Sequence, residues 1–332
     1  PRLANPVCLY VDHGGDVYVA ETFRHSAGVP DIREHMDWLD DDLASRTVSD
    51  RVEMFRKHLG ERFEEYTTEH ERVRLLRDTD DDGAADLDAV FADGFSEAPD
   101  GIGAGLLSYQ GAVFYACMPN LWRLHDRDGD GRAERREALS SGYGVRVALL
   151  GHDLHGLRIG PDGRLYFTCG DRGFNVLTQE GERIEHWDTG AVLRCELDGS
   201  GLEVFATGLR NPQELAFDDH GELFTGDNNS DGGDRARIVH VVEGSDSGWR
   251  QAYQWITQPV LRGPWNAERM WLPAWDDQAA YILPPIANLA DGPSGFASYP
   301  GTGFGPGWAG RFFLVDFRGA PEISGIHAFT LE

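Results

Sequence analysis

The most informative repeat in the sequence is His155-Gly-Leu-Arg-Ile-Gly-Pro-Asp-Gly-Arg-Leu-Tyr-Phe-Thr-Cys-Gly-Asp171. It reads as an apolar strand, a Pro-Asp-Gly turn and a second apolar strand, which is the pattern of a β-hairpin. Close copies cover 213–227 and 7–21, and weaker copies cover 106–117 and 296–316. A hairpin cannot bury its apolar faces alone, so the repeats predict several sheets stacked side by side.

Such repeats predict an all-β fold, a β-propeller. Five copies are recognisable, and at about 40 to 50 residues per blade a ring of six is reasonable for 332 residues. The closing blade is then either incomplete or built from both chain ends. We expect a single propeller domain over 1–332, and the 41 Gly and 16 Pro agree with many turns and few long helices.

One region breaks this rhythm. Between residues 31 and 71 the sequence is strongly charged, and Val48, Val52, Phe55 and Leu59 share one helical face. We expect a helical insertion that begins at Ser45 or Thr47 and packs its apolar stripe on the side of the blades.

The overall charge excludes some classes of partner. With 30 basic and 56 acidic residues the chain carries a net charge of −26, which disfavours nucleic acid and anionic membranes. The apolar runs are too short to span a bilayer. The four cysteines form no CxxC motif, so buried free thiols are favoured and a disulfide is left open.

Two acidic loops, 78–89 and 126–137, read DxDxDG. Alternate carboxylates followed by a glycine converge on one point, as Ca²⁺ requires. The expected ligands are Asp78, Asp80, Asp82 and Asp86 in the first loop, and Asp126, Asp128, Asp130 and Glu137 in the second. Glu137 holds the twelfth position, where the first loop has Ala89. The alternative is that both loops are solvated acidic turns.

Polar residues also precede two of the hairpins. His152 and His155 stand before one, and Arg210 and Asn211 stand before the next at the equivalent place. Loops entering successive inner strands of a propeller meet at one face, so these four side chains could line one pocket, with histidine as a base and arginine holding a carboxylate. The alternative is that the histidines are structural.

These motifs resemble those of a known protein family. The run from His152 to Asn175, the segment 192–200, and Gly208-Leu-Arg-Asn-Pro-Gln213 followed by Gly226-Asp-Asn-Asn229 resemble the soluble quinoprotein sugar dehydrogenases. With the helical insertion, the paired loops and 292–295, the chain looks like the bacterial membrane-bound dehydrogenase branch of that superfamily. The resemblance implies a six-bladed propeller of the quinoprotein glucose dehydrogenase type that uses pyrroloquinoline quinone (PQQ) and calcium.

The resemblance also implies roles for single residues. His152 and Arg210 would be catalytic, with His152 as the base; Arg210, Asn211, Gln213 and His155 would contact the cofactor, and Asn228 would bind calcium. It further implies a sugar or alcohol substrate, a cytochrome-type electron acceptor and a periplasmic or otherwise extracytoplasmic location. The sequence departs from the pattern at Gly151, where the sugar enzymes carry Asp, and its only lysine is Lys57.

Two other functions stay open. One is a calcium-dependent propeller hydrolase of the lactonase kind, with a metal held by Glu21, Asn211, Asp227 and Asn228. The other is a non-catalytic propeller that binds a glycan or protein through its tryptophans, which are Trp249, Trp255, Trp265, Trp271 and Trp275. The alternative for these tryptophans is that they fill space between blades.

Overall fold

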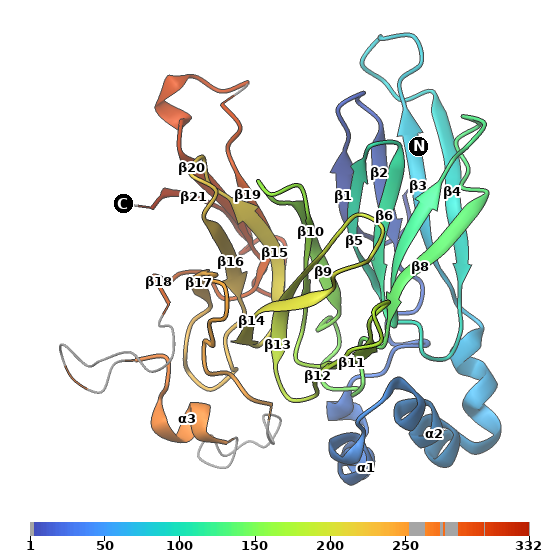
Figure 1. The fold of residues 1–332 in the computed structure, drawn as a ribbon, viewed down its shortest axis with the longest axis vertical. Coiled ribbons are helices and arrows are strands. Elements are labelled where there is room, and N and C mark those ends of the chain that lie inside the picture. The colour runs from blue at the N-terminus through green and yellow to red at the C-terminus, as the bar shows by residue number, and fades with distance from the viewer. Residues whose placement is uncertain (1–2, 252–262, 273–274, 276–284, 302, 332) are drawn as a thin grey trace. The chain divides into compact units, whose positions relative to one another are not determined.

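The structure is a computed structural model that describes residues 3–251, 263–272, 275, 285–301 and 303–331 (Figure 1). Its contacts divide the chain into two compact units. The first unit comprises Pro1–Leu157, Arg172–Trp187 and Asp198–Gly201, and the second comprises Arg158–Asp171, Asp188–Leu197 and Leu202–Glu332.

The first unit contains two antiparallel four-stranded sheets and a short ribbon (Figure 1). The first sheet runs in the order β1 (Pro6–Val11), β2 (Val17–Glu21), β3 (Glu71–Arg77) and β4 (Leu87–Phe95). The second runs β5 (Gly103–Tyr109), β6 (Ala112–Cys117), β7 (Asn120–His125) and β8 (Arg135–Ser141). The ribbon pairs β11 (Phe174–Leu177) with β12 (Arg183–His186).

Three further sheets follow along the chain. The third has the order β9 (Leu154–Ile159), β10 (Leu165–Cys169), β13 (Gly190–Cys195) and β14 (Glu203–Leu209). The fourth has β15 (Pro212–Phe217), β16 (Leu223–Asp227), β17 (Arg237–His240) and β18 (Ala287–Asn288). The fifth has three strands, β19 (Pro293–Ser298), β20 (Arg311–Asp316) and β21 (Gly325–Thr330).

These sheets confirm the all-β propeller, but the prediction of six blades is wrong, because the described residues form five. The sixth blade was expected from about 40 to 50 residues per blade plus insertions. Two segments between the hairpins form other structures and contribute no blade: residues 22–70 contain helices, and 170–189 contain the β11–β12 ribbon.

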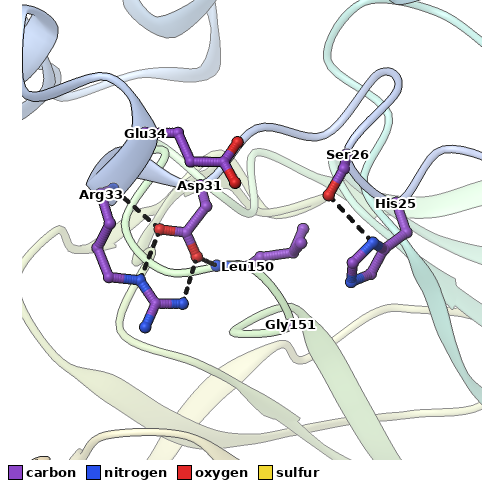
Figure 2. Close-up of a pocket in the computed structure, with 7 residues that line it drawn as sticks. All are labelled: His25, Ser26, Asp31, Arg33, Glu34, Leu150 and Gly151. Carbon is purple, nitrogen blue, oxygen red and sulfur yellow. Dashed lines mark hydrogen bonds and ion pairs between the residues drawn. The ribbon is translucent and has the colours of Figure 1, made fainter.

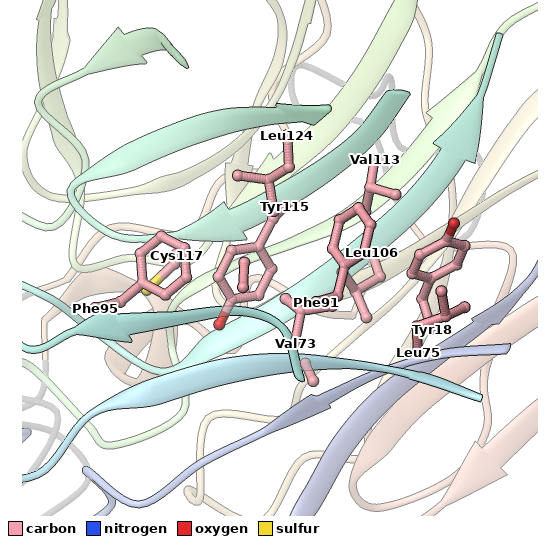
Figure 3. Packing of buried hydrophobic residues seen from close by; sticks show 12 residues of the cluster. Tyr18, Val73, Leu75, Phe91, Phe95, Leu106, Val113, Tyr115, Cys117 and Leu124 are labelled. Carbon is pink, nitrogen blue, oxygen red and sulfur yellow. The ribbon is translucent and has the colours of Figure 1, made fainter. Parts of the chain in front are cut away.

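The core of the first unit lies between its two sheets (Figure 3). Tyr18 meets the edge of Phe91 with ring centroids 5.1 Å apart, and Tyr115 meets Phe95 at the same distance. Gly103 is needed here, because a Cβ atom would fall within 1.6 Å of the Tyr115 hydroxyl.

The helices of the first unit lie within the predicted insertion. They are η1 (Ile32–Glu34), η2 (Met36–Trp38), α1 (Leu39–Ala44), α2 (Val48–Leu59) and η3 (Gly60–Thr67); α3 (Pro264–Glu268) and η5 (Pro306–Trp308) lie in the second unit. Thr47 caps α2 in a capping box with Asp50. The buried face of α2 is centred on Arg51, Met54 and Phe55, so the expected stripe is rotated and only Phe55 of its four members is fully buried.

A single arginine fastens this insertion to the blades. The guanidinium of Arg24 is fully buried and donates to six backbone carbonyls, those of Gly28, Tyr66, Glu69, Ser96, Glu97 and Asp100. Gly28 lies directly against it, since a Cβ there would come within 2.7 Å of the Arg24 Cζ. Burial lowers the pKa of Arg24.

Three blades share the same hydrogen-bonded carboxylate at the end of their second strand. A carboxylate there accepts an N–H from just before the first strand of the same blade: Ala4 to Glu21 at 2.5 Å, Asn211 to Asp227 at 2.8 Å and Asp291 to Asp316 at 2.8 Å. Each carboxylate also pairs with a cationic or imidazole side chain on the third strand, namely Arg72, Arg237 and His327. In each of these hairpins, the carboxylate therefore joins the start of the first strand to the end of the second.

Candidate functional site

The histidine motif lies in the first unit, on the loop that leads into β9. His152 is buried, and the next residue, Asp153, forms an ion pair with Arg172 in which both side chains are fully buried. Arg172 also donates from Nε to the carbonyl of Arg146 at 3.0 Å. Asp153 is therefore fixed in place, and it fixes the backbone beside His152.

His155 organises the same turn. Its Nε2 lies 3.1 Å from the Asp153 nitrogen and 3.1 Å from the Gly151 carbonyl oxygen. Burial lowers the pKa of His155, so the ring is neutral at neutral pH. The structure thus gives His155 a part in shaping the loop that carries His152.

The helical insertion holds this loop from the other side. Asp42, fully buried on α1, accepts the N–H of Val147 at 2.6 Å, and Asp31 accepts the N–H of Leu150 at 3.0 Å. Burial raises the pKa of Asp42. Between these contacts Ala148 has a φ of +47°, a conformation that side chains other than glycine rarely adopt. The insertion therefore supports a strained loop just before His152.

A pocket of about 440 Å³ opens beside this loop (Figure 2). It lies wholly in the first unit and is lined by His25, Ser26, Asp31, Arg33, Glu34, Leu150 and Gly151. Arg33 donates to both oxygens of Asp31, at 2.9 and 2.8 Å. Five of the seven lining residues have polar or charged side chains.

The second motif lies in the second unit. The backbone N–H groups of Arg210 and Asn211 both donate to Asp227, which is fully buried and paired with Arg237. Asn211 is buried as well. Asp227 therefore fixes the turn before β15. Like Glu21, which pairs with Arg72 at 2.5 Å, it is engaged within the protein and not held open for a metal.

The guanidinium of Arg210 is the part of this motif that already holds a carboxylate. It donates to Asp231 at 2.7 Å and to the Asn229 carbonyl, and it lies 5.5 Å from the ring centre of Trp249. The Arg210 side chain is 1% exposed and that of Asp231 is 59% exposed, so a ligand carboxylate would have to displace Asp231 to reach the guanidinium. The donor set fits one carboxylate group of a quinone such as PQQ.

Two further predicted residues flank this motif. Gln213 is half-buried on β15, and Asn228 follows β16 directly, with its Oδ1 accepting the N–H of Asn229 at 2.9 Å. His152 and His155 belong to the first unit, whereas Arg210, Asn211, Gln213 and Asn228 belong to the second. Each unit thus carries its own part of the predicted set.

The acidic loops occupy the same place in two successive blades. Residues 78–86 join β3 to β4, and 126–134 join β7 to β8. Ligand oxygens lie within 4.8 Å of one another in Asp78, Asp80 and Asp82, and likewise in Asp126, Asp128, Asp130 and Glu134. In both hairpins the carboxylates converge and could hold a cation, and neither loop is flanked by helices.

The ninth position, and not the twelfth, supplies the fourth carboxylate of the second loop. Glu134 accepts the N–H of Arg127 at 2.7 Å, as Asp86 accepts that of Thr79 at 3.0 Å in the first loop. Glu137 instead pairs with Arg123 at 2.7 Å, which lowers its pKa. The shared acid nine residues into both loops was a signal visible in the sequence.

The tryptophan cluster is largely interior. Trp249 and Trp265 are buried with ring centres 5.8 Å apart, and Trp271 lies 6.0 Å from Trp265. Trp275 is 65% exposed, and Trp255 lies outside the described residues. Trp249 and Trp265 therefore serve packing, which removes them from a glycan-binding surface.

Comparison with known proteins places the chain in a family. Residues 1–314 match the family described as "Domain of unknown function (DUF7133)". The chain belongs to this family. The DUF7133 chain is also 32% identical over 124 residues to quinoprotein glucose dehydrogenase B of Acinetobacter calcoaceticus, a match that covers 30% of this chain and 26% of that relative. It is thus homologous to a quinoprotein dehydrogenase over about a quarter of the relative's length.

Solved structures share the fold of the DUF7133 chain. The PQQ-bound aldose sugar dehydrogenase of Streptomyces coelicolor matches with a TM-score of 0.51 at 18% identity, over 99% of this chain and 82% of that one. A glucose dehydrogenase gives 0.55 at 19%, over 79% and 77%. The holo PQQ domain of the Coprinopsis cinerea pyranose dehydrogenase gives 0.51 at 12%, over 94% and 71%. At these identities the likeness concerns the fold alone.

Among the helices of the described residues, none is long and apolar enough to cross a membrane.

Proposed function

We propose that this DUF7133 chain oxidises a sugar or alcohol with PQQ as the cofactor. The homology to a quinoprotein glucose dehydrogenase and the shared fold support this kind of function. When bound, the quinone supplies an acceptor for the hydride that leaves the substrate carbon. Within the second unit, Arg210 would hold one of its carboxylates, with Asn211 and Gln213 as further contacts, and Asn228 would offer an oxygen to a nearby calcium.

In this proposal His152 is the general base that removes the proton from the substrate hydroxyl. One observation carries the assignment: the loop bearing His152 is held at both sides, by the buried Asp153–Arg172 pair and by Asp31 and Asp42 of the insertion. A base held in fixed geometry needs little reorganisation in the transition state. Arg210, by holding the cofactor, keeps the acceptor oriented.

The test is a titration of the chain with PQQ, with and without calcium, followed by dye reduction with a panel of aldoses. We expect stoichiometric binding and sugar-dependent turnover, and we expect His152→Ala to lower turnover by about 10² to 10⁴-fold without loss of folding. His220→Ala, an exposed histidine on the β15–β16 turn, is the matched control. Unchanged turnover in His152→Ala would remove His152 from the mechanism.

We also propose that the two acidic loops bind structural calcium, and that the chain works outside the cytoplasm with a cytochrome-type acceptor. The converging carboxylates of the loops support the first part. The location and the acceptor rest on the resemblance to quinoprotein dehydrogenases.

A further inference from the structure

We infer that the pocket between the helical insertion and the His152 loop is a binding site for a neutral sugar ring. This inference rests on the proposed function and names where its substrate is held. The pocket volume of about 440 Å³ is in the range of small-molecule sites. Its wall includes Gly151, the residue that directly precedes His152 (Figure 2).

The polar groups of the wall select the ligand class. Glu34 offers carboxylate oxygens that accept hydrogen bonds, and Arg33 offers guanidinium N–H groups that donate them. The Arg33 side chain pairs with Asp31 and is 60% exposed. A sugar hydroxyl both donates and accepts, and therefore suits both groups.

Other ligand classes fit the pocket less well. Leu150 is the only aliphatic side chain among the lining residues, which disfavours an apolar ligand. The lining holds the carboxylates of Asp31 and Glu34 and one guanidinium, which is already paired with Asp31, and this negative balance disfavours an anion. A neutral polyhydroxylated ligand satisfies the wall without leaving a buried charge unpaired.

The insertion supplies an anchored carboxylate to this pocket. The Asp31 side chain is 7% exposed and accepts hydrogen bonds from the Arg33 side chain and from the N–H of Leu150. One carboxylate thus joins the pocket wall to the loop before His152. Asp31 is a positioning residue, whereas Arg33 and Glu34 would touch the sugar.

The experiment measures binding of D-glucose, maltose and D-xylose to the full chain by calorimetry, without PQQ. We expect Arg33→Ala and the conservative Glu34→Gln each to raise Kd for the sugar that binds by about tenfold, the loss of one charge-assisted hydrogen bond. Arg62→Ala and Glu65→Gln, an exposed ion pair on η3 of the same insertion, should leave Kd unchanged.

The outcomes separate this inference from the proposed function. Sugar binding that weakens in Arg33→Ala and Glu34→Gln supports the pocket even if no dye is reduced. Turnover whose KM is the same in both variants and in the parent chain overturns the pocket while the proposed function stands. Absence of binding to all three sugars also overturns it. Thermal unfolding of each variant checks that Kd is measured on folded protein.

Discussion

At the scale of single residues, the first unit buries charges that the sequence presents as ordinary surface acids. Asp100 is buried beside Arg24, and its Oδ2 accepts the N–H of Glu97 at 2.9 Å. Burial raises its pKa from 3.8 to about 6, although Arg24 and Arg51 act in the opposite direction. The folded state therefore binds more protons than the unfolded state between about pH 4 and pH 6.

Asp100→Asn tests this directly. Because the folded pKa is raised, the contribution of Asp100 to the unfolding free energy should fall as pH rises from 4 to 6, by up to about 3 kcal/mol. The variant cannot ionise at this position, so its unfolding free energy should rise relative to that of the parent chain over that window. Urea unfolding at pH 4, 5, 6 and 7 measures both slopes. Parallel slopes for the two proteins would contradict the raised pKa.

At the scale of elements, the same hairpin closure recurs with its own sequence signature. In three blades the first strand begins with proline, and that proline pairs with the acid that ends the second strand: Pro6 with Glu21, Pro212 with Asp227 and Pro293 with Asp316. Although burial acts to raise the pKa of Asp316, hydrogen bonds from Asp291, His327, Gly292 and Arg318 hold it well below its ordinary value. These carboxylates are structural ties whose oxygens are engaged by donors of the protein.

The acidic hairpins make a second prediction at this scale. Calcium should raise the melting temperature of the parent chain by mass action. Glu134→Gln should lose most of that rise, because Glu134 lies with the converging carboxylates, whereas Glu137→Gln should keep it, because Glu137 pairs with Arg123.

Scanning calorimetry with calcium or EDTA measures the effect, and magnesium serves as the competing ion. An equal loss of the calcium response in both variants would show that Glu137, at the twelfth position, also contributes to calcium binding. A parent chain whose melting temperature ignores calcium would leave the loops as solvated turns.

At the scale of the whole molecule, the charge of −26 opposes folding through self-repulsion. Dissolved salt screens this repulsion over about 10 Å at 0.1 M. We expect the melting temperature to rise between 20 and 300 mM NaCl, measured in EDTA so that calcium does not contribute. A falling melting temperature would show that exposed ion pairs such as Arg62–Glu65 outweigh the net charge.

The sequence predicted the hairpins well, because each hairpin depends on a local pattern of apolar runs and turn residues. It did not predict the blade number, since the residues between hairpins form helices and a ribbon as readily as another blade. It also missed Asp42 as a support of the His152 loop. The contact between Asp42 and Val147 joins residues 105 positions apart, and no periodicity within either segment records it. The run from Asp40 to Asp42 reads simply as a solvated surface.

The contacts of Arg24 predict a short sequence pattern in other chains that carry this helical insertion. Lysine has three N–H donors against the five of arginine, so it would leave more of the six carbonyls that meet there without a donor. The guanidinium also leaves no room for a side chain at Gly28. An Arg-x-x-x-Gly pattern just after the second strand of the first blade therefore indicates this arrangement. Chains that carry the pattern should share the helical insertion.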